Sequence, residues 1–427
     1  MNLALAVLLC GTLLAPPRLR EIDLRLPSTA AEPGGLALRV VVPASGRYGP
    51  VAPVAIVVPG GWQGSSLARL AAPLAPLGFI EVRFTFPGEG EGEGRSGGMP
   101  DLRGPRAVQA VADVASFAAS RTRASDGRTL AEIVAPLALL GEQSGMLALS
   151  NGGNTALLAL SGREAACRGV GWVVTWETPF GDAAAAGLYG VRGEQPNPAY
   201  DPATGRYDAS SLAWDPFLLL RGVLGGFYHD LNHNGRCDTG DWVLDALVQA
   251  RPDGTRVLAY PLVVLREAER RRLCGARWPA AMLGSSEAEG FWRERNADGC
   301  LAALAISRPD LLAMVVASDQ DHVQSAPDHP HVFGLYDGWR RAGLPFVRLN
   351  PDAAYLGAVL GGLPPGYLET PANAVLAREA LPRRLAPAGA VPRPMLLAAA
   401  AAELADRSRQ KATAVDLEAV LFPVDRL

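Results

Sequence analysis

The stretch around Ser150 carries the clearest chemical signal in this chain. A short apolar run, 145–149, leads into the serine, and Gly152 and Gly153 follow before a second apolar run begins. This pattern predicts a buried strand, a tight turn and a helix in succession. Such a turn lifts the serine hydroxyl to a helix N-terminus, where backbone N–H groups can stabilise an oxyanion. Ser150 is our candidate nucleophile; a serine that only caps a turn is the plainer alternative. Ser144 is a weaker rival, because it precedes the strand.

A second pattern falls mid-chain, where residues 230–241 read Asp-Leu-Asn-His-Asn-Gly-Arg-Cys-Asp-Thr-Gly-Asp. The spacing fits the twelve-residue calcium loop of EF-hands, although aspartate replaces the usual glutamate at the last position. We expect the apolar stretches 217–224 and 242–248 to form flanking helices, and an Asx-rich turn without metal is the alternative. The predicted ligands of a structural Ca²⁺ are Asp230, Asn232, Asn234, the carbonyl of Arg236, Asp238 and Asp241.

The elements that must position these residues alternate along the chain. Apolar or alternating runs predict strands at 21–26, 36–42, 54–58, 79–86, 145–149, 170–176, 311–317 and 345–349. Helical spacing predicts helices at 65–77, 106–119, 130–139, 151–160, 332–342, 373–381 and 395–409. Strands that alternate with helices indicate an α/β fold, with a mostly parallel sheet covered by helices on both faces.

The alternation stops between about residues 181 and 309, where Pro, Gly, Asp and Tyr become frequent. We therefore expect a core in two parts, 21–180 and 310–427, interrupted by an insertion, 181–309, that carries the predicted calcium loop. The length of 427 residues suits such a large domain with an insertion. A net charge of −3 argues against nucleic acid or an anionic membrane as partner.

Residues 1–20 have the pattern of a signal peptide without its usual basic start. Their apolar run, 3–14, is too short to span a bilayer comfortably, so no transmembrane span is predicted. We expect a secreted or periplasmic protein; a misplaced start codon or a hydrophobic N-terminal strand is the alternative. Cys274 and Cys300, both in the insertion, are then the plausible disulfide pair.

The order of these motifs resembles the α/β-hydrolase family over nearly all of residues 21–427 outside the insertion. The segment 59–62, Pro-Gly-Gly-Trp, is similar to the family's His-Gly-Gly oxyanion loop, with proline in place of histidine. The segment 86–94 is similar to the Pro-Gly-x-Gly stretch after the fourth strand. The segment 149–153 matches the nucleophile elbow, with Ala148 in place of the first glycine of Gly-x-Ser-x-Gly. The resemblance implies an α/β-hydrolase fold with a cap inserted between strands six and seven.

The resemblance also implies roles for individual residues. Ser150 would be the nucleophile, and the N–H of Asn151, with one from Gly61 or Trp62, would form the oxyanion hole. The segment Ser-Asp-Gln-Asp-His-Val that ends strand seven points to Asp321 as the acid. Further candidates for the acid are Asp319, Glu177 and Asp182. Carboxylates that cap helices or bind arginines are the plainer reading of all four.

The base is harder to place, because the family's usual segment after the last strand, 349–355, contains no histidine. Three histidines cluster instead in the loop that leaves the sheet edge presenting Ser150: His322, His329 and His331. We take His329 as the base, since nearby prolines stiffen its position, with Asp328 or Asp321 to orient the imidazole. The alternatives are that these histidines cap the next helix, pack, or bind a metal ion.

Together these features predict a serine hydrolase that cleaves a small-molecule or lipid-like ester through an acyl-enzyme on Ser150, with an amide as the less favoured substrate class. Aromatic residues of the insertion are expected either to shape an apolar acyl pocket or to belong to its core: Trp214, Phe217, Tyr228, Trp242 and Phe291. Two alternatives stay open. One is a catalytically inactive relative, stabilised by calcium, that binds a ligand or partner; the other is acyl transfer by the same serine.

Overall fold

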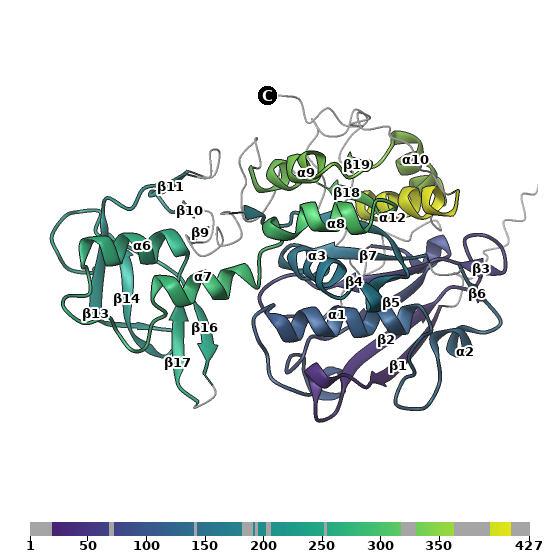
Figure 1. Cartoon of the computed structure of the whole chain (residues 1–427), viewed down its shortest axis with the longest axis horizontal. Coiled ribbons are helices and arrows are strands. Elements are labelled where there is room, and N and C mark those ends of the chain that lie inside the picture. Colours follow the sequence, from purple (N-terminus) through teal and green to yellow (C-terminus); the bar gives the residue numbers. More distant parts are fainter. Residues whose placement is uncertain are drawn as a thin grey trace, which may run out of the picture.

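The computed structural model describes residues 19–67, 72–140, 143–181, 191–192, 195–201, 206–251, 254–316, 330–362 and 393–410. None of the helices within these ranges is long and apolar enough to cross a membrane. The described residues form a larger α/β lobe and a smaller lobe that lies beside it (Figure 1).

An eight-stranded sheet, counted over the described residues, is the centre of the larger lobe. Its strands in spatial order are β1 (Arg20–Leu26), β2 (Leu36–Val42), β5 (Ile80–Phe84), β4 (Val54–Val58), β7 (Ser144–Leu149), β8 (Val170–Trp176), β18 (Leu312–Val316) and β19 (Phe346–Leu349). Strand β2 runs antiparallel to both its neighbours, and the other pairs are parallel. The central strand β4 is buried on both faces, which explains its unbroken Val-Ala-Ile-Val-Val sequence.

Helices cover both faces of this sheet. On one face lie α1 (Pro105–Ala118), α3 (Asn151–Gly162), α4 (Glu164–Cys167), α8 (Leu301–Ser307) and α9 (Pro330–Ala342). On the other lie α10 (Ala353–Gly362) and α12 (Arg393–Arg409). The period of two along β7 serves both layers, since Met146 packs with the first group and Leu147 with the second. This mostly parallel sheet between helical layers confirms the predicted α/β-hydrolase fold.

The smaller lobe is formed by chain that runs between β8 and β18, where the insertion was expected. It contains β9 (Val191–Arg192), β10 (Gln195–Pro196), β11 (Tyr200–Asp201), β12 (Arg206–Tyr207), β13 (Leu212–Leu220), β14 (Val223–His229), β15 (Trp242–Val243), β16 (Leu247–Ala250), β17 (Arg256–Ala259), α6 (Leu262–Arg271) and α7 (Ser285–Arg293). Its own hydrophobic core includes Phe227, Tyr260 and Trp292. Helix α8, which follows in the chain, packs instead with α3 and α9 of the larger lobe. The bounds 181–309 stay a prediction.

Two predicted helices differ from the structure. Ser65 does not begin the helix expected at 65–77: it forms a β-bridge with Thr85, their hydroxyls 2.6 Å apart, and the described remainder holds only the 3₁₀ helix η2 (Ala75–Leu77). The helix expected at 130–139 is shorter in the structure, where α2 spans only Leu130–Val134. It ends there because Pro136 disfavours helical backbone at the residue before it.

Two further elements of the structure were not predicted. Residues Ala138–Leu139, beyond the shortened helix α2, form β6, which pairs with β3 (Val51–Ala52). The helix α10 was not expected, since its apolar composition gives no polar face to define a helical period. The helix predicted at 373–381 lies outside the described residues.

Candidate functional site

Ser150 lies at the junction of β7 and α3, as the sequence predicts. Its backbone has φ 47° and ψ −127°, a conformation that costs a non-glycine residue roughly 1–3 kcal/mol. Two hydrogen bonds hold the turn: the Ser150 N–H donates to the carbonyl of Trp176 at 2.7 Å, and the Gly153 N–H donates to the Ser150 carbonyl at 2.8 Å. The serine therefore stands at a sharp bend at the carboxyl edge of the sheet.

The loop after β4 packs directly against this bend. A Cβ added to Gly152 would lie 2.5 Å from the Pro59 carbonyl oxygen, and one added to Gly60 would lie 3.1 Å from the Ser150 Cβ. The two backbones approach so closely that glycine is required at both positions. The segment 59–62, predicted to be the oxyanion loop, is thus beside the serine. Asn151 begins α3, so its N–H belongs to the electropositive end of that helix.

The rival serine lies at the other edge of the sheet. Ser144 is the first residue of β7, and its buried hydroxyl donates to the Gly169 carbonyl at 3.0 Å. Because β7 runs the full depth of the sheet between them, Ser144 and Ser150 cannot serve one site.

The carboxyl edge also carries one of the candidate acids. Glu177 directly follows β8, is fully buried and has φ 44°. Its N–H donates at 3.2 Å to the carbonyl of Val316, the last residue of β18. Since β7, β8 and β18 are parallel neighbours, Ser150, Glu177 and the last residue of β18, Val316, lie at one edge of the sheet. The other candidates lie outside the described residues: Asp182, Asp319 and Asp321. The choice of acid stays a prediction.

The predicted base cannot be placed from the described residues. Three of the residues concerned lie outside the described ranges: His322, His329 and Asp328. The backbone of His331 is part of α9, but its side chain is not among those described. The remaining two histidines belong to the smaller lobe. His229 is buried there between the Tyr207 hydroxyl at 2.9 Å and the Ser211 hydroxyl at 2.8 Å. Burial lowers the pKa of His229 to about 4, so this imidazole is neutral near pH 7.

The 230–241 loop joins two strands, and the flanking helices expected for it are wrong. Strand β14 ends at His229 and β15 begins at Trp242, and these two residues pair in antiparallel register. On its other side β14 pairs with β13. Aromatic and aliphatic residues in these stretches favour a pleated sheet with one face on the lobe's core, which explains the outcome.

Four of the predicted calcium ligands in this loop converge. Side-chain oxygens of Asp230 and Asn232 both accept from the Asn234 N–H, at 3.1 and 3.0 Å. The Asp238 carboxylate accepts from the side-chain amides of Asn232 at 3.1 Å and Asn234 at 2.7 Å. These side chains offer the hard oxygen donors that Ca²⁺ prefers.

The other two predicted ligands close the loop. Asp241 is buried and accepts from the N–H groups of Leu231 and Asp238, both at 2.9 Å, while the Arg236 N–H donates to Asn234 Oδ1 at 2.8 Å. Over the described residues, no three His, Cys, Asp or Glu side chains form a group suited to a metal ion. The donor set here includes two asparagines, and calcium binding stays a prediction.

The predicted disulfide is absent, since Cys274 and Cys300 are both free among the described cysteines. Cys274 packs on the core of the smaller lobe, whereas Cys300 packs on the core of the larger lobe and donates to the Ala297 carbonyl at 3.1 Å. Nearness in the chain did not bring the two thiols together, because the chain crosses between lobes before α8.

The aromatic residues of the insertion are mostly packing residues. Trp242 and Phe291 belong to the core of the smaller lobe, Tyr228 is buried, and Trp214 packs against Phe227 with ring centroids 5.1 Å apart. Phe217 is 83% exposed, so it is no part of a buried pocket.

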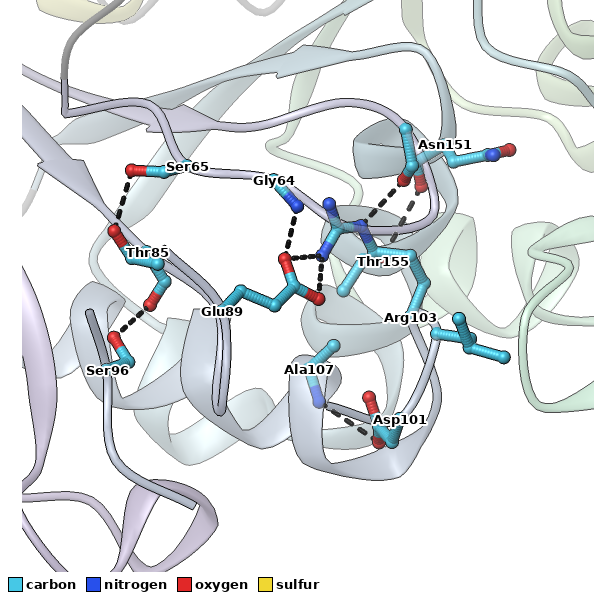
Figure 2. Close-up of polar contacts among 12 residues, drawn as sticks. Gly64, Ser65, Thr85, Glu89, Ser96, Asp101, Arg103, Ala107, Asn151 and Thr155 are labelled. Atoms are coloured by element: carbon cyan, nitrogen blue, oxygen red, sulfur yellow. Dashed lines mark hydrogen bonds and ion pairs between the residues drawn. The ribbon is translucent and has the colours of Figure 1, made fainter. Parts of the chain in front are cut away.

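One buried arginine beside the site was missed by the sequence reasoning. Arg103 donates through Nε to the Gly61 carbonyl at 2.8 Å and through Nη2 to the Gly60 carbonyl at 2.9 Å. Figure 2 shows its guanidinium between Glu89 and the loop that lies next to Asn151. Glu89, inside the Pro-Gly-x-Gly stretch, accepts from Arg103 at 3.3 Å. The sequence signal for such a buried arginine was Glu89, a carboxylate within a glycine-rich turn.

No family model matches the sequence, and no curated protein does. Several solved structures are similar at low identity. One of two esterases from the fungus Rhizomucor miehei is 13% identical, with 93% of this chain and 86% of that chain covered and a TM-score of 0.42. Brefeldin A esterase, a bacterial homologue of human hormone-sensitive lipase, is 14% identical, with 96% and 81% covered and a TM-score of 0.41. A proline iminopeptidase-related protein from Thermus thermophilus is 18% identical, with 95% and 99% covered and a TM-score of 0.37. These TM-scores are low, and the fold assignment rests on the sheet and its helical layers.

Proposed function

We propose that this protein is a serine hydrolase that cleaves a small-molecule or lipid-like ester. The observation that carries the proposal is the backbone of Ser150, strained at φ 47° and ψ −127° between β7 and α3. A capping serine needs no such strain, because caps adopt relaxed extended backbone. Strain of this kind is typical of nucleophile elbows, where it exposes the hydroxyl at the top of the sheet.

The reaction follows from the groups at the carboxyl edge. The Ser150 oxygen attacks the acyl carbon while its proton passes to the imidazole, for which His329 is our candidate. The oxyanion is stabilised by the N–H of Asn151 and by one from Gly61 or Trp62. The leaving alcohol takes the proton from the imidazole, and a water molecule then hydrolyses the acyl-enzyme by the same route. Asp321, or Glu177 at the end of β8, orients the imidazole.

We also propose that the protein is exported and that Ca²⁺ stabilises the smaller lobe, here acting as a cap. The support is the convergence of oxygen donors in the 230–241 loop, which closes the β14–β15 hairpin. The ion would be held by Asp230, Asn232, Asn234, the Arg236 carbonyl, Asp238 and Asp241. Millimolar extracellular calcium suffices to fill even a weak loop of this kind.

The test of catalysis is turnover of p-nitrophenyl acyl esters together with labelling by a fluorophosphonate, with calcium present. We expect labelling at Ser150 that is lost in Ser150→Ala. The matched control is Ser144→Ala, which removes a buried serine from the same strand and should keep labelling and turnover. A folded wild-type protein that is neither labelled nor active would contradict the proposal and favour a ligand-binding relative without catalysis.

A further inference from the structure

Arg103 holds two successive peptide units of the oxyanion loop. The carbonyl of Gly60 shares a peptide plane with the N–H of Gly61, and the carbonyl of Gly61 shares one with the N–H of Trp62. In a trans peptide the C=O and N–H point in opposite directions. When Arg103 draws both carbonyls toward its guanidinium, the two N–H groups are turned away from it. One of these two amides is the donor that, with the N–H of Asn151, the proposed function assigns to the oxyanion.

The guanidinium is itself fixed from several sides. It is 1% exposed and lies 3.8 Å from the centre of the Phe86 ring. Glu89 accepts from Arg103 and also from the N–H of Gly64, so one carboxylate joins the arginine to the far end of the loop. Burial raises the pKa of Glu89 and lowers that of Arg103, each opposed by the partner's charge. Neither charge is stable there without the other.

A second arginine links the Arg103–Glu89 pair to the smaller lobe. Leu102 and Arg103 both have positive φ, 56° and 68°. Arg295, which follows α7, donates to the Leu102 carbonyl at 3.0 Å and to the Asp101 carbonyl at 2.7 Å, and its guanidinium is buried. It therefore holds the unusual turn that aims Arg103 at the loop.

An aromatic contact makes the same link directly. The ring of Trp62, in the oxyanion loop, packs edge-on against Trp292 of α7, with centroids 5.6 Å apart. The smaller lobe thus contacts the loop directly through the Trp292 ring, and indirectly through Arg295, which bonds to the turn before Arg103.

We propose that Arg103 is a positioning residue for ester cleavage: it fixes the Gly61 and Trp62 peptide units so that one of their amides faces the oxyanion, and Arg295 links Arg103 to the smaller lobe. The inference rests on the proposed function. It adds that the oxyanion hole is assembled only when the two lobes are in contact.

The main test compares two buried arginines that each grip two backbone carbonyls. Arg103→Lys keeps the charge but cannot hold both carbonyls in a fork. We expect kcat for p-nitrophenyl esters and the rate of phosphonylation to fall about 10- to 100-fold with KM nearly unchanged, since the amides act on the transition state. The control is Arg308→Lys, whose parent side chain grips the Cys167 and Val170 carbonyls at the amino edge and should keep wild-type rates.

A second readout does not depend on activity. Hydrogen–deuterium exchange of the 59–64 peptide should quicken in Arg103→Lys and in Arg295→Gln but not in Arg308→Lys. If Arg103→Lys fails to fold, Glu89→Gln and Arg295→Gln carry the test. Wild-type kcat and wild-type exchange in these variants would overturn the inference. An inactive, unlabelled wild type would sink the proposed function instead, and exchange would still decide whether Arg103 orders the loop.

Discussion

The elbow at Ser150 and the loop at 230–241 are both tight turns, yet they are held in opposite ways. The elbow is held from outside: by the end of β8, by the loop after β4 and, through that loop, by Arg103. The 230–241 loop is held almost wholly by its own side chains, which bond to its own N–H groups.

This difference shows what keeps each turn in its backbone conformation. The elbow keeps a strained serine because the surrounding fold determines its backbone, which is what the proposed nucleophile would require. The loop gathers three aspartates with no cationic side chain bonded to any of them among its described contacts. The proposed Ca²⁺ would supply the positive charge that these contacts lack.

The sharpest way to break the comparison is to push the elbow and its neighbour apart. In Gly152→Ala the new methyl group would meet the Pro59 and Val58 carbonyls at 2.5 and 2.9 Å. We expect ester turnover to fall at least about 100-fold and the free energy of unfolding to fall by about 2–3 kcal/mol, measured by denaturation.

The control for this prediction lies in the same helix. Gly162→Ala adds a methyl group with nothing within 4 Å, so it should keep full activity and gain up to about 1 kcal/mol from helix propensity. Normal turnover in Gly152→Ala would show that the elbow tolerates what we take it to exclude.

Removing calcium should affect the smaller lobe and leave the elbow's chemistry intact at low temperature. At calcium 100-fold above its Kd, the ion adds about 2.7 kcal/mol to the free energy of unfolding. We expect a chelator to lower Tm, and Asp238→Asn to weaken the effect, while fluorophosphonate labelling at 20 °C persists. A Tm that ignores both calcium and the substitution would mean an Asx-rich turn without metal.

The free energy of unfolding should depend on pH through His229, which directly precedes the first residue of the 230–241 loop. The folded pKa, lowered to about 4 by burial, lies below the unfolded value of about 6.5. Between these values the unfolded chain binds the proton, so stability falls as pH falls, by about 2 kcal/mol at pH 5. Denaturation at pH 7.5 and pH 5 should show a smaller acid loss in His229→Gln, and equal losses would exclude His229 as a cause.

The smallest effect is expected from an ion pair beside the loop but outside it. Asp245 pairs with Arg221, and both side chains are more than a third exposed. Asp245→Ala should change the free energy of unfolding by less than about 1 kcal/mol and leave calcium affinity unchanged. A large loss of calcium affinity would show that general negative charge, rather than the loop's geometry, attracts the ion.

The parts of this protein that the sequence predicted are those whose signal lies within ten or so residues. A buried run, a serine and two glycines specify the elbow, because strand, turn and helix are contiguous there. The alternation of buried strands and helices likewise predicted the sheet, whose central strands show it most clearly.

Only the tertiary structure decided what those local signals could not carry. The flanks of the 230–241 loop are strands because β13 pairs with β14, and the separation of Cys274 from Cys300 follows from the lobe each one packs against. Arg103 reaches carbonyls more than forty positions away in the chain. The sequence alone determined where the elbow serine stands; the fold decided what holds the loop beside it, because buried hydrogen bonds between distant segments leave no periodic trace in the chain.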